Sequence, residues 1–365
     1  MNSFELITSF GKIIVFLMIL FSVFLFTVHS QNKLANRVFS VFLLITALDL
    51  SGLFLNGFFI EYPDPMILKI SSSLLQMPLF FIYVLAVCYS DFKIEIKHFA
   101  HAVLFFIFLV VFKVTSVSEQ NLFYFRIVAE IQYFAYILAI IYTLKKYKTI
   151  YLENYSNADY SGYKWLFQIT IYFCFAHIFV MLKAGALFLG LGENYIKFLY
   201  ILISISAMLV ICWFVLKALY KPHLFTGIKT EHVSVEATVE KRETYPEKDE
   251  KILASIESLS RYMETEKPYL DFDLSLEKLA SNLDMPEKEL SILINHHLGK
   301  HFFDFINEYR IAEAKKILEN PENKKLTILE ILYEVGFNSK SSFYTAFKKN
   351  TGQTPTAFRK LALAG

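Results

Sequence analysis

The sequence contains little cysteine and almost no net charge. Its 365 residues include 3 Cys, and the formal net charge at pH 7 is +2. Cys88, Cys174 and Cys212 are widely spaced within apolar runs and form no CxxC pair, so they fit neither a disulfide framework nor a zinc site. The HExxH, GxSxG and GxxxxGK(S/T) motifs of hydrolases and phosphate-binding loops are also absent. We therefore expect no catalytic residues, no metal, no cofactor and no enzymatic activity.

Apolar residues, in contrast, are in excess. They make up 55% of the chain, which includes 38 Phe and has a mean hydropathy of +0.42. This composition is too apolar for soluble domains, and the excess is confined to about residues 4–219. Beyond Pro222 the density of charged residues rises sharply. The change predicts a membrane domain at 1–221, a juxtamembrane linker at 222–249 and a separate domain at 250–365.

Seven apolar stretches are each long enough to cross a bilayer as a helix, which takes roughly 20 residues. They lie near residues 11–28, 38–60, 67–90, 98–117, 122–144, 165–190 and 196–219. Helical patterns continue in the charged domain. We therefore predict an all-α fold, with a polytopic seven-helix domain followed by a second helical domain.

The Lys and Arg residues between these stretches predict the topology. They gather in the connections after the first, third, fifth and seventh stretches, whereas the other connections are almost bare of them. By the positive-inside rule, the N-terminus lies outside and the C-terminus in the cytoplasm. A cleaved signal peptide at 11–28 is the alternative, but cleavage would put the C-terminus outside and Lys33 and Arg37 on the wrong side. We expect a multi-pass protein of the inner (cytoplasmic) membrane.

Ionisable residues within the spans are functional candidates, because they are costly to bury in a membrane. Glu130 has Arg126 one helical turn away, so a local ion pair is expected. Asp49 has no charged residue one turn away in either direction. It must be neutral, bond a residue of another helix such as His177 or Lys183, or face a wet cavity. Asp49, His177 and Lys183 are thus candidates for a ligand or switch role, with a structural hydrogen bond as the alternative.

The stretch 326–360 has the pattern of a helix-turn-helix. Apolar residues recur at helical spacing from Ile328 to Val335 and stop at Gly336, where a left-handed turn is expected. Asn338 or Ser339 can cap a second helix, whose inward side is apolar. Its other side is polar and cationic without any acid, which suits a helix in the major groove of DNA. The residues of that side are Lys340, Ser341, Tyr344, Thr345 and Lys348.

A similar pattern precedes it. A helix is expected at about 247–266, a second opens with Ser275 as its cap, and a turn at Asp284 leads into a third. In this third helix the inner side is apolar, with Leu290, Leu293 and Ile294. For the outer side we predict DNA contacts by Lys288, Ser291 and Asn295.

These motifs resemble the signature of the AraC (AraC/XylS) family of bacterial transcription regulators. The residues that carry the resemblance are Gly336-Phe337, Ser341-Ser342-Phe343, Phe347-Lys348-Lys349, Gly352, Pro355 and Arg359. One departure is Leu332, where the family usually has a small alanine. The stretch from Gly299 to Leu318 is similar to the helix that joins the two modules in this family. The resemblance covers about residues 250–361 and implies that double-stranded DNA is the partner.

The combination predicts a membrane-embedded transcription regulator. Its transmembrane helices would sense an unknown small-molecule or membrane signal within the lipid bilayer and control promoters through the cytoplasmic domain. A homodimer is one arrangement that the sequence leaves open. The alternative is an integral-membrane transporter-like protein or enzyme with a regulatory DNA-binding tail. Residues 222–365 carry slightly more acid than base, but Lys and Arg predominate from Lys324 onward, so the second module is expected to hold the phosphates.

Overall fold

The computed structural model describes residues 3–28, 32–156, 161–220 and 246–363. Within these residues the chain is helical and forms no strand, only an isolated antiparallel bridge between Tyr155 and Ser275. This confirms the all-α prediction. The chain divides into two compact units, Met1–Lys145 with Ser161–Thr230, and Lys146–Tyr160 with Glu231–Gly365. Most of the predicted linker at 222–249 lies outside the described residues.

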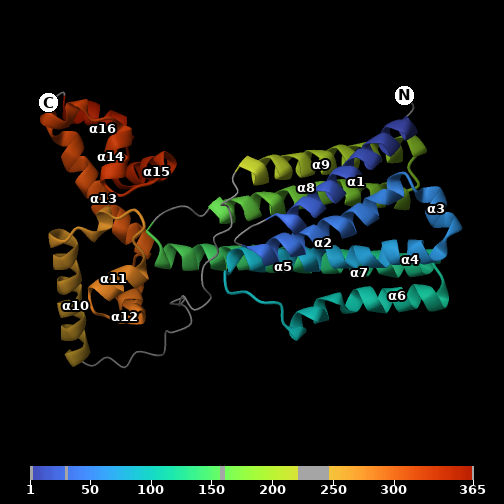
Figure 1. Ribbon diagram of the computed structural model, residues 1–365, viewed down its shortest axis with the longest axis horizontal. Helices are drawn as coiled ribbons and strands as arrows, with labels where there is room; N and C mark the ends of the chain where they lie inside the picture. Colours follow the sequence, from blue (N-terminus) through green and yellow to red (C-terminus); the bar gives the residue numbers. More distant parts are fainter. Residues whose placement is uncertain (1–2, 29–31, 157–160, 221–245, 364–365) are drawn as a thin grey trace. The chain divides into compact units, whose positions relative to one another are not determined.

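The first unit is a bundle of long apolar helices (Figure 1). The helices that lie wholly or partly in it are α1 (Ser3–Thr27), α2 (Lys33–Leu50), α3 (Asn56–Glu61), α4 (Pro63–Ser72), α5 (Gln76–Cys88), α6 (Val103–Thr115), α7 (Glu119–Asn154), α8 (Ser161–Phe188) and α9 (Glu193–Tyr220), with the 3-10 turns η1 (Ser51–Leu53), η2 (Ser73–Leu75) and η3 (Ile96–Ala102). Among the described residues, seven helical segments have the length and composition to cross a membrane, as predicted.

Two of the predicted stretches have different limits in the structure. The stretch 38–60 does not form one helix, because α2 ends at Leu50 and α3 starts only at Asn56. Gly52 lies at this break, and a Cβ there would come within 2.7 Å of Cε of Lys69. The glycine therefore leaves room for the Lys69 side chain. The fifth stretch is longer than predicted, since α7 continues to Asn154, ten residues beyond 144.

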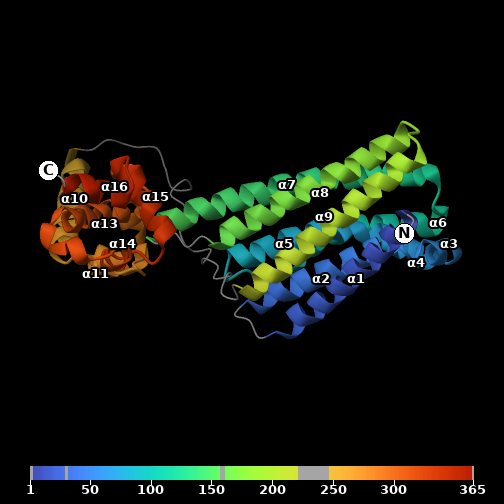
Figure 2. The same cartoon turned by 90° about the horizontal axis from the view of Figure 1, so that it is seen from above.

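Small polar and aromatic side chains join the helices of the first unit. Helix α1 packs on α2 and α9, and α8 lies beside α9 (Figure 1 and Figure 2). Buried Ser22 and Ser40 share a hydrogen bond of 2.7 Å between α1 and α2, a contact typical of close helix packing in membranes. The ring of Phe39 stacks on Phe214 at 4.4 Å and lies 4.6 Å from Tyr83. Helices α1, α2, α5 and α9 are thus tied together by a polar contact and an aromatic cluster.

The second unit contains seven further helices. These are α10 (Pro246–Thr265), α11 (Leu276–Asn282), α12 (Glu287–Ile292), α13 (Phe302–Glu319), α14 (Ile328–Glu334), α15 (Lys340–Thr351) and α16 (Pro355–Ala362), with the 3-10 turns η5 (Pro268–Leu270) and η7 (Pro321–Lys325) and the π-helical turn η6 (Leu293–His297). The last residues of α7, from Lys146 onward, belong to this unit as well.

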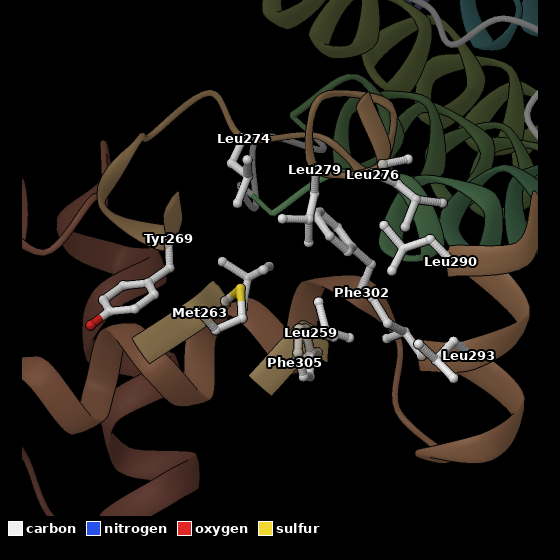
Figure 3. Packing of buried hydrophobic residues seen from close by; sticks show 13 residues of the cluster. Leu259, Met263, Tyr269, Leu274, Leu276, Leu279, Leu290, Leu293, Phe302 and Phe305 are labelled. Carbon is white, nitrogen blue, oxygen red and sulfur yellow. The ribbon is translucent and has the colours of Figure 1, made fainter. Parts of the chain in front are cut away.

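Two hydrophobic cores build the second unit, and α13 contributes to both. The first core joins α10, α11 and α12 with the start of α13, where Phe302 and Phe305 are buried (Figure 3). The second core joins α14 and α15 with the later part of α13, where Ile311 and Leu318 are buried. Each core holds one helix-turn-helix module, and the shared helix α13 holds the two modules in one unit.

Candidate functional site

The second module is a helix-turn-helix whose ends are defined by capping residues. Thr327 caps α14 with its hydroxyl on the amide of Glu330, and the Glu330 carboxylate accepts from the Thr327 amide at 2.6 Å. Helix α14 gives way to Gly336, whose φ of +86° is in the left-handed region. Ser339 then caps α15, accepting from the Ser342 amide. The local predictions for this module are confirmed, with Ser339 as the cap of the two residues considered.

The two sides of α15 divide as the sequence predicted. Phe343, Ala346 and Phe347 are buried in the core. On the other side, Lys340, Ser341, Thr345 and Lys348 are exposed and Tyr344 is half-buried. The ammonium of Lys340 lies 5.6 Å from the centre of the Tyr344 ring, so the two side chains form one patch at the start of the helix. The patch is free to meet a ligand, and contact with DNA remains a prediction for these five residues.

The cations near this face are not equivalent. Lys349 pairs with Asp304 of α13 at 2.6 Å, and Arg359 donates to the Leu326 carbonyl at 2.7 Å, so both hold the module together. Lys340 and Lys348, in contrast, form no ion pair with any described residue. These two are the cations of α15 that are available for phosphate or a base edge.

The first module differs from the sequence prediction on its outer side. Lys288 is exposed as predicted, but Ser291 is only 2% exposed, and half-buried Asn295 donates to its hydroxyl at 3.1 Å. The placement of Ser291 on the outer side is therefore wrong. Helix α10 packs against η6, on the apolar side of Leu293 and Ile294. The π-helical turn at 293–297 also takes in about one extra residue, which rotates the side chains that follow away from an ideal α-helical wheel.

Arg310, at the middle of α13, is a central residue that sequence reasoning missed. Its side chain is completely buried. Nε donates to the Tyr269 carbonyl at 2.7 Å, Nη2 to the Asp271 carbonyl at 2.7 Å, and Nη1 to the Ser156 carbonyl at 2.9 Å. Burial lowers the pKa of the guanidinium to about 10, and the Asp271 carboxylate acts in the opposite direction. The guanidinium group therefore stays charged at neutral pH, and the dipoles of the three carbonyl groups stabilise its charge.

The sequence did contain a signal for this residue. Arg310 lies four residues after Ile306 and four before Ala314, so it occupies the buried side of an apolar helix pattern. A buried arginine must have its donors satisfied, which makes it a candidate for joining several segments. Which segments it joins depends on the tertiary structure.

The residues after α7 pair with the chain that enters the first helix-turn-helix. The Ser156 hydroxyl donates to the Leu274 carbonyl at 2.6 Å and accepts from Nη2 of Arg310 at 3.1 Å, and the Ser156 amide also bonds Leu274. The neighbouring Tyr155 bridges to Ser275, the cap of α11. The end of α7 is therefore joined directly to the start of the first module.

The two modules also meet near Arg310. Its guanidinium lies 5.5 Å from the centre of the Phe337 ring in the turn of the second module. At Gly336, an added Cβ would come within 2.6 Å of the Tyr269 carbonyl oxygen and 2.8 Å of that of Leu270. Glycine is thus required there both by its φ and by this close approach. One buried side chain contacts the α7 extension, the first module and the second module.

Each of the three candidates in the first unit has its own partner. The Asp49 carboxylate is 3.4 Å from the Lys69 ammonium and 3.4 Å from the Gln76 amide. Of the alternatives considered for Asp49, a partner on another helix is confirmed, but the partner is Lys69 of α4, next to Gly52, and neither His177 nor Lys183. The ammonium of Lys183 instead lies 4.8 Å from the centre of the Tyr200 ring.

His177 has a partner that the sequence did not indicate. Its Nε2 lies 2.8 Å from the Glu130 carboxylate, and its ring stacks on Tyr133 at 3.7 Å. The expected local pair of Glu130 with Arg126 is therefore wrong, since the carboxylate is directed to α8. Asp49 and His177 nevertheless line one cavity of about 220 Å³. No group of three or more His, Cys, Asp or Glu that could hold a metal is found in the described part of the chain.

The fold and the exposed face of α15 define a class. Two helix-turn-helix modules on a shared helix, one with an exposed polar and cationic recognition helix, form a DNA-binding domain. In agreement, residues 279–361 match a protein-family model described as a helix-turn-helix domain. The C-terminal part of the chain thus contains a helix-turn-helix domain.

The relatives that match this region are transcription regulators. An uncharacterized HTH-type transcriptional regulator of Staphylococcus aureus is 38% identical over 87 residues, which are 24% of this chain and 11% of that protein. An uncharacterized HTH-type transcriptional regulator from the cgkA 5' region of Pseudoalteromonas carrageenovora is 33% identical over 88 residues, 24% of this chain and 50% of that protein. The match thus spans half or less of each regulator's length.

A solved structure also matches part of the chain. The C-terminal domain of AraT, a response regulator from Geobacillus stearothermophilus, is 30% identical and covers 28% of this chain and 84% of that chain, with a TM-score of 0.25.

Proposed function

We propose that this protein is a membrane-embedded transcription regulator whose seven helices cross the inner membrane and set the DNA-binding state of the cytoplasmic AraC-type domain. The match to helix-turn-helix regulators supports DNA-binding regulation. The seven long apolar helices and the distribution of Lys and Arg between them support residence in the membrane, with the C-terminal domain on the cytoplasmic side. Double-stranded DNA would be bound chiefly by the Lys340 side of α15.

The observation that carries the regulatory part is that α7 belongs to both units. Residues 119–145 of this one helix lie in the first unit, and from Lys146 the helix belongs to the DNA-binding unit. There, Ser156 is buried against Leu274 and Arg310. A rotation or shift of α7 would change the support of Ser275, which caps the first helix-turn-helix, and of Arg310, which contacts both modules. Signal transmission would then need no second protein.

Inserting alanines into α7 after Lys145 tests this route. Each inserted residue rotates the following helix by about 100° and moves it by about 1.5 Å, whereas seven residues restore the face to within about 20°. In cells that express the full-length protein, crosslinking, isolation of membranes and sequencing of the attached DNA would identify the bound sites, and a promoter next to such a site would serve as reporter.

We expect discrete DNA sites in the membrane fraction, a reporter response that is lost with one or two inserted alanines, and a response that returns with seven. The same insertions after Thr230 are the matched control and should leave the response intact. Absence of enriched DNA from the membrane fraction would contradict a membrane-embedded regulator. A response that is the same for all insertion lengths in α7 would instead exclude α7 as the route.

A further inference from the structure

We propose that the cavity between the membrane helices binds a neutral amphiphile of about ten non-hydrogen atoms, with an apolar body and a hydroxyl head that donates a hydrogen bond to Asp49. This inference rests on the proposed membrane-embedded regulator and names the chemical class of its signal. The cavity lies wholly in the first unit and receives residues from α1, α2, α5, α7, α8 and α9.

The volume and the lining of the cavity determine the size and the apolar character of the ligand's body. Its volume is about 220 Å³, whereas an apolar cavity of about 150 Å³ holds one benzene molecule. Most of the wall is aliphatic or aromatic, as at Phe42, Leu43, Phe173 and Val210. A polar molecule would leave its hydrogen-bonding groups unsatisfied against this wall. An apolar chain or ring system of about ten non-hydrogen atoms fits both the volume of the cavity and its apolar wall.

The polar groups of the wall determine the head. The Thr46 hydroxyl donates to the Phe42 carbonyl and the Ser206 hydroxyl to the Ile203 carbonyl, both at 2.8 Å, so their oxygens remain as acceptors. The Asp49 oxygens receive Lys69 and Gln76 only at 3.4 Å, near the outer limit of a hydrogen bond, and a carboxylate has about four acceptor positions. These three groups offer acceptors, to which a ligand hydroxyl can donate.

The charge balance at Asp49 favours a neutral head over a charged one. Lys69 already compensates the carboxylate, so an added ammonium or carboxylate would introduce an unpaired charge into a membrane interior. A hydroxyl adds no charge and can donate to the free acceptor positions of Asp49. His177 lines another part of the wall, and its Nε2 is engaged by the Glu130 carboxylate at 2.8 Å.

Photolabelling of the full-length protein in phosphatidylcholine nanodiscs tests the proposal without DNA. The probe is nonanol with a diazirine near the end of its chain, and labelled positions are found by mass spectrometry. We expect labels within 39–50, 169–180 or 203–214, the segments that line the cavity. Unlabelled nonanol should compete, whereas nonane and nonanoate should each compete roughly tenfold or more weakly, because neither can donate a hydrogen bond to Asp49 at neutral pH.

Two variants test recognition of the ligand's hydroxyl head and of its apolar body separately. Asp49→Leu removes the acceptor and should make nonanol compete no better than nonane, while Asp64→Leu, which changes an exposed carboxylate that pairs with Lys113 outside the cavity, should behave as wild type. Ala207→Phe fills part of the cavity and should abolish cavity labels while leaving Asp49 in place. It keeps the test decisive if Asp49→Leu does not fold.

Three results would overturn the proposal. Equal competition by nonane would mean that the cavity only holds a hydrocarbon chain such as that of a lipid. Stronger competition by nonanoate would mean that Lys69 recognises an anion. Labels that lie outside the cavity or persist in Ala207→Phe would mean that the cavity is no binding site. None of these results bears on DNA binding, which the membrane-fraction experiment measures separately, so failure here and failure of the proposed function are distinguishable.

Discussion

At the scale of single residues, cationic side chains have two different roles in the second unit: some are exposed to solvent, and one is completely buried. Lys340 and Lys348 are exposed and unpaired among the described residues, so their ammonium groups are available for a ligand. Arg310 is buried, and its donors are used by carbonyl groups of three segments. The first two residues should therefore affect binding, and the third should affect the stability of the unit.

Lys340→Ala should weaken binding to the specific site by roughly 1 to 3 kcal/mol and relax preference at one base pair, because the start of a recognition helix faces base edges. Lys348→Ala should weaken binding to all sequences alike and lower the salt slope by about one ion, because a lysine two turns later meets phosphate. Titrations of the full-length protein in micelles over a salt series, on specific and scrambled duplexes, measure both effects.

Lys316→Ala on α13 is the control for these two substitutions, because Lys316 is an exposed lysine paired with Glu313 on the same helix. It should leave affinity and salt slope unchanged. If Lys340→Ala and Lys348→Ala also leave them unchanged, the exposed side of α15 does not meet DNA.

Arg310→Lys should destabilise the second unit by roughly 2 to 5 kcal/mol even though it keeps the charge. A lysine has no planar fork, so it cannot reach the Tyr269, Asp271 and Ser156 carbonyls together and leaves buried acceptors unpaired. Thermal unfolding followed by limited proteolysis of the full-length protein measures the change. Arg261→Lys, at an exposed pair with Glu257, should change stability by less than about 1 kcal/mol. Equal melting temperatures for Arg310→Lys and wild type would show that the fork is not required.

At the scale of elements, helix ends decide how the recognition helices are held. Helix α14 begins with a reciprocal cap between Thr327 and Glu330, and α15 begins at Ser339 after the left-handed Gly336. Each cap satisfies amides that have no partner within the helix. The first module depends in addition on a remote segment, since Tyr155 and Ser156 pair with the residues that open α11. Local caps thus define the second module, and a tertiary contact supports the first.

The cap of α14 should respond to acid. The hydrogen bond from the Thr327 amide lowers the pKa of the Glu330 carboxyl below its ordinary value. Its stabilising effect is therefore present above the pKa of the unfolded chain and is lost as pH falls through the lower pKa of the folded state. Between about pH 6 and about pH 3, the melting temperature of the second unit should fall more in wild type than in Glu330→Gln, which does not titrate.

Other carboxylates titrate over the same pH range and also lower the melting temperature. The effect of Glu330 is therefore the difference between the pH curves of wild type and Glu330→Gln. Glu322→Gln, on the preceding turn, is the matched control and should keep the full dependence on pH. Curves of identical shape for wild type and Glu330→Gln would show that the carboxylate does not stabilise α14. Thr327→Ala should in addition cost about 1 kcal/mol at neutral pH through loss of the hydroxyl cap.

At the scale of the whole molecule, the proposed topology has to agree with the course of α7, which continues from the first unit into the second. In the proposed topology, seven crossings would put the first and the last described helix ends on opposite sides of the membrane, so an outside start of α1 would go with a cytoplasmic helix-turn-helix domain. The end of α7 that continues into the second unit from Lys146 onward would then be the cytoplasmic end of the proposed fifth span. The proposed signal route through α7 therefore requires the proposed topology, with the helix-turn-helix domain in the cytoplasm.

Fusions to a phosphatase that is active only outside the cytoplasm test the topology. Fusions at Pro63 and Glu193 should be active, because both residues lie in connections without Lys or Arg, and fusions at Lys93 and Thr230 should be silent. A cytoplasmic reporter enzyme at the same four positions should give the reverse pattern and serves as the control. Phosphatase activity at Thr230 would put the helix-turn-helix domain on the side without DNA and would contradict the proposed function.

The sequence by itself determined the features that depend on local pattern. Long apolar runs predicted seven spans, because the bilayer requires each crossing helix to be apolar along its whole length. Helical periodicity ending at Gly336, followed by Ser339, predicted the second helix-turn-helix and its exposed side. Caps, turns and amphipathic faces arise between residues a few positions apart, so they can be read without knowledge of the fold.

Only the tertiary structure decided the pairs formed by residues far apart in the chain. Lys69 reaches Asp49, Glu130 turns to His177 rather than Arg126, and Arg310 bonds Ser156 from 154 positions away. Ser291 is buried, with Asn295 donating to its hydroxyl, although the helical wheel of its own segment placed it on the outer side. The partner of a polar group is set by which helices pack together, and the energy of that packing comes from many contacts that no local spacing records.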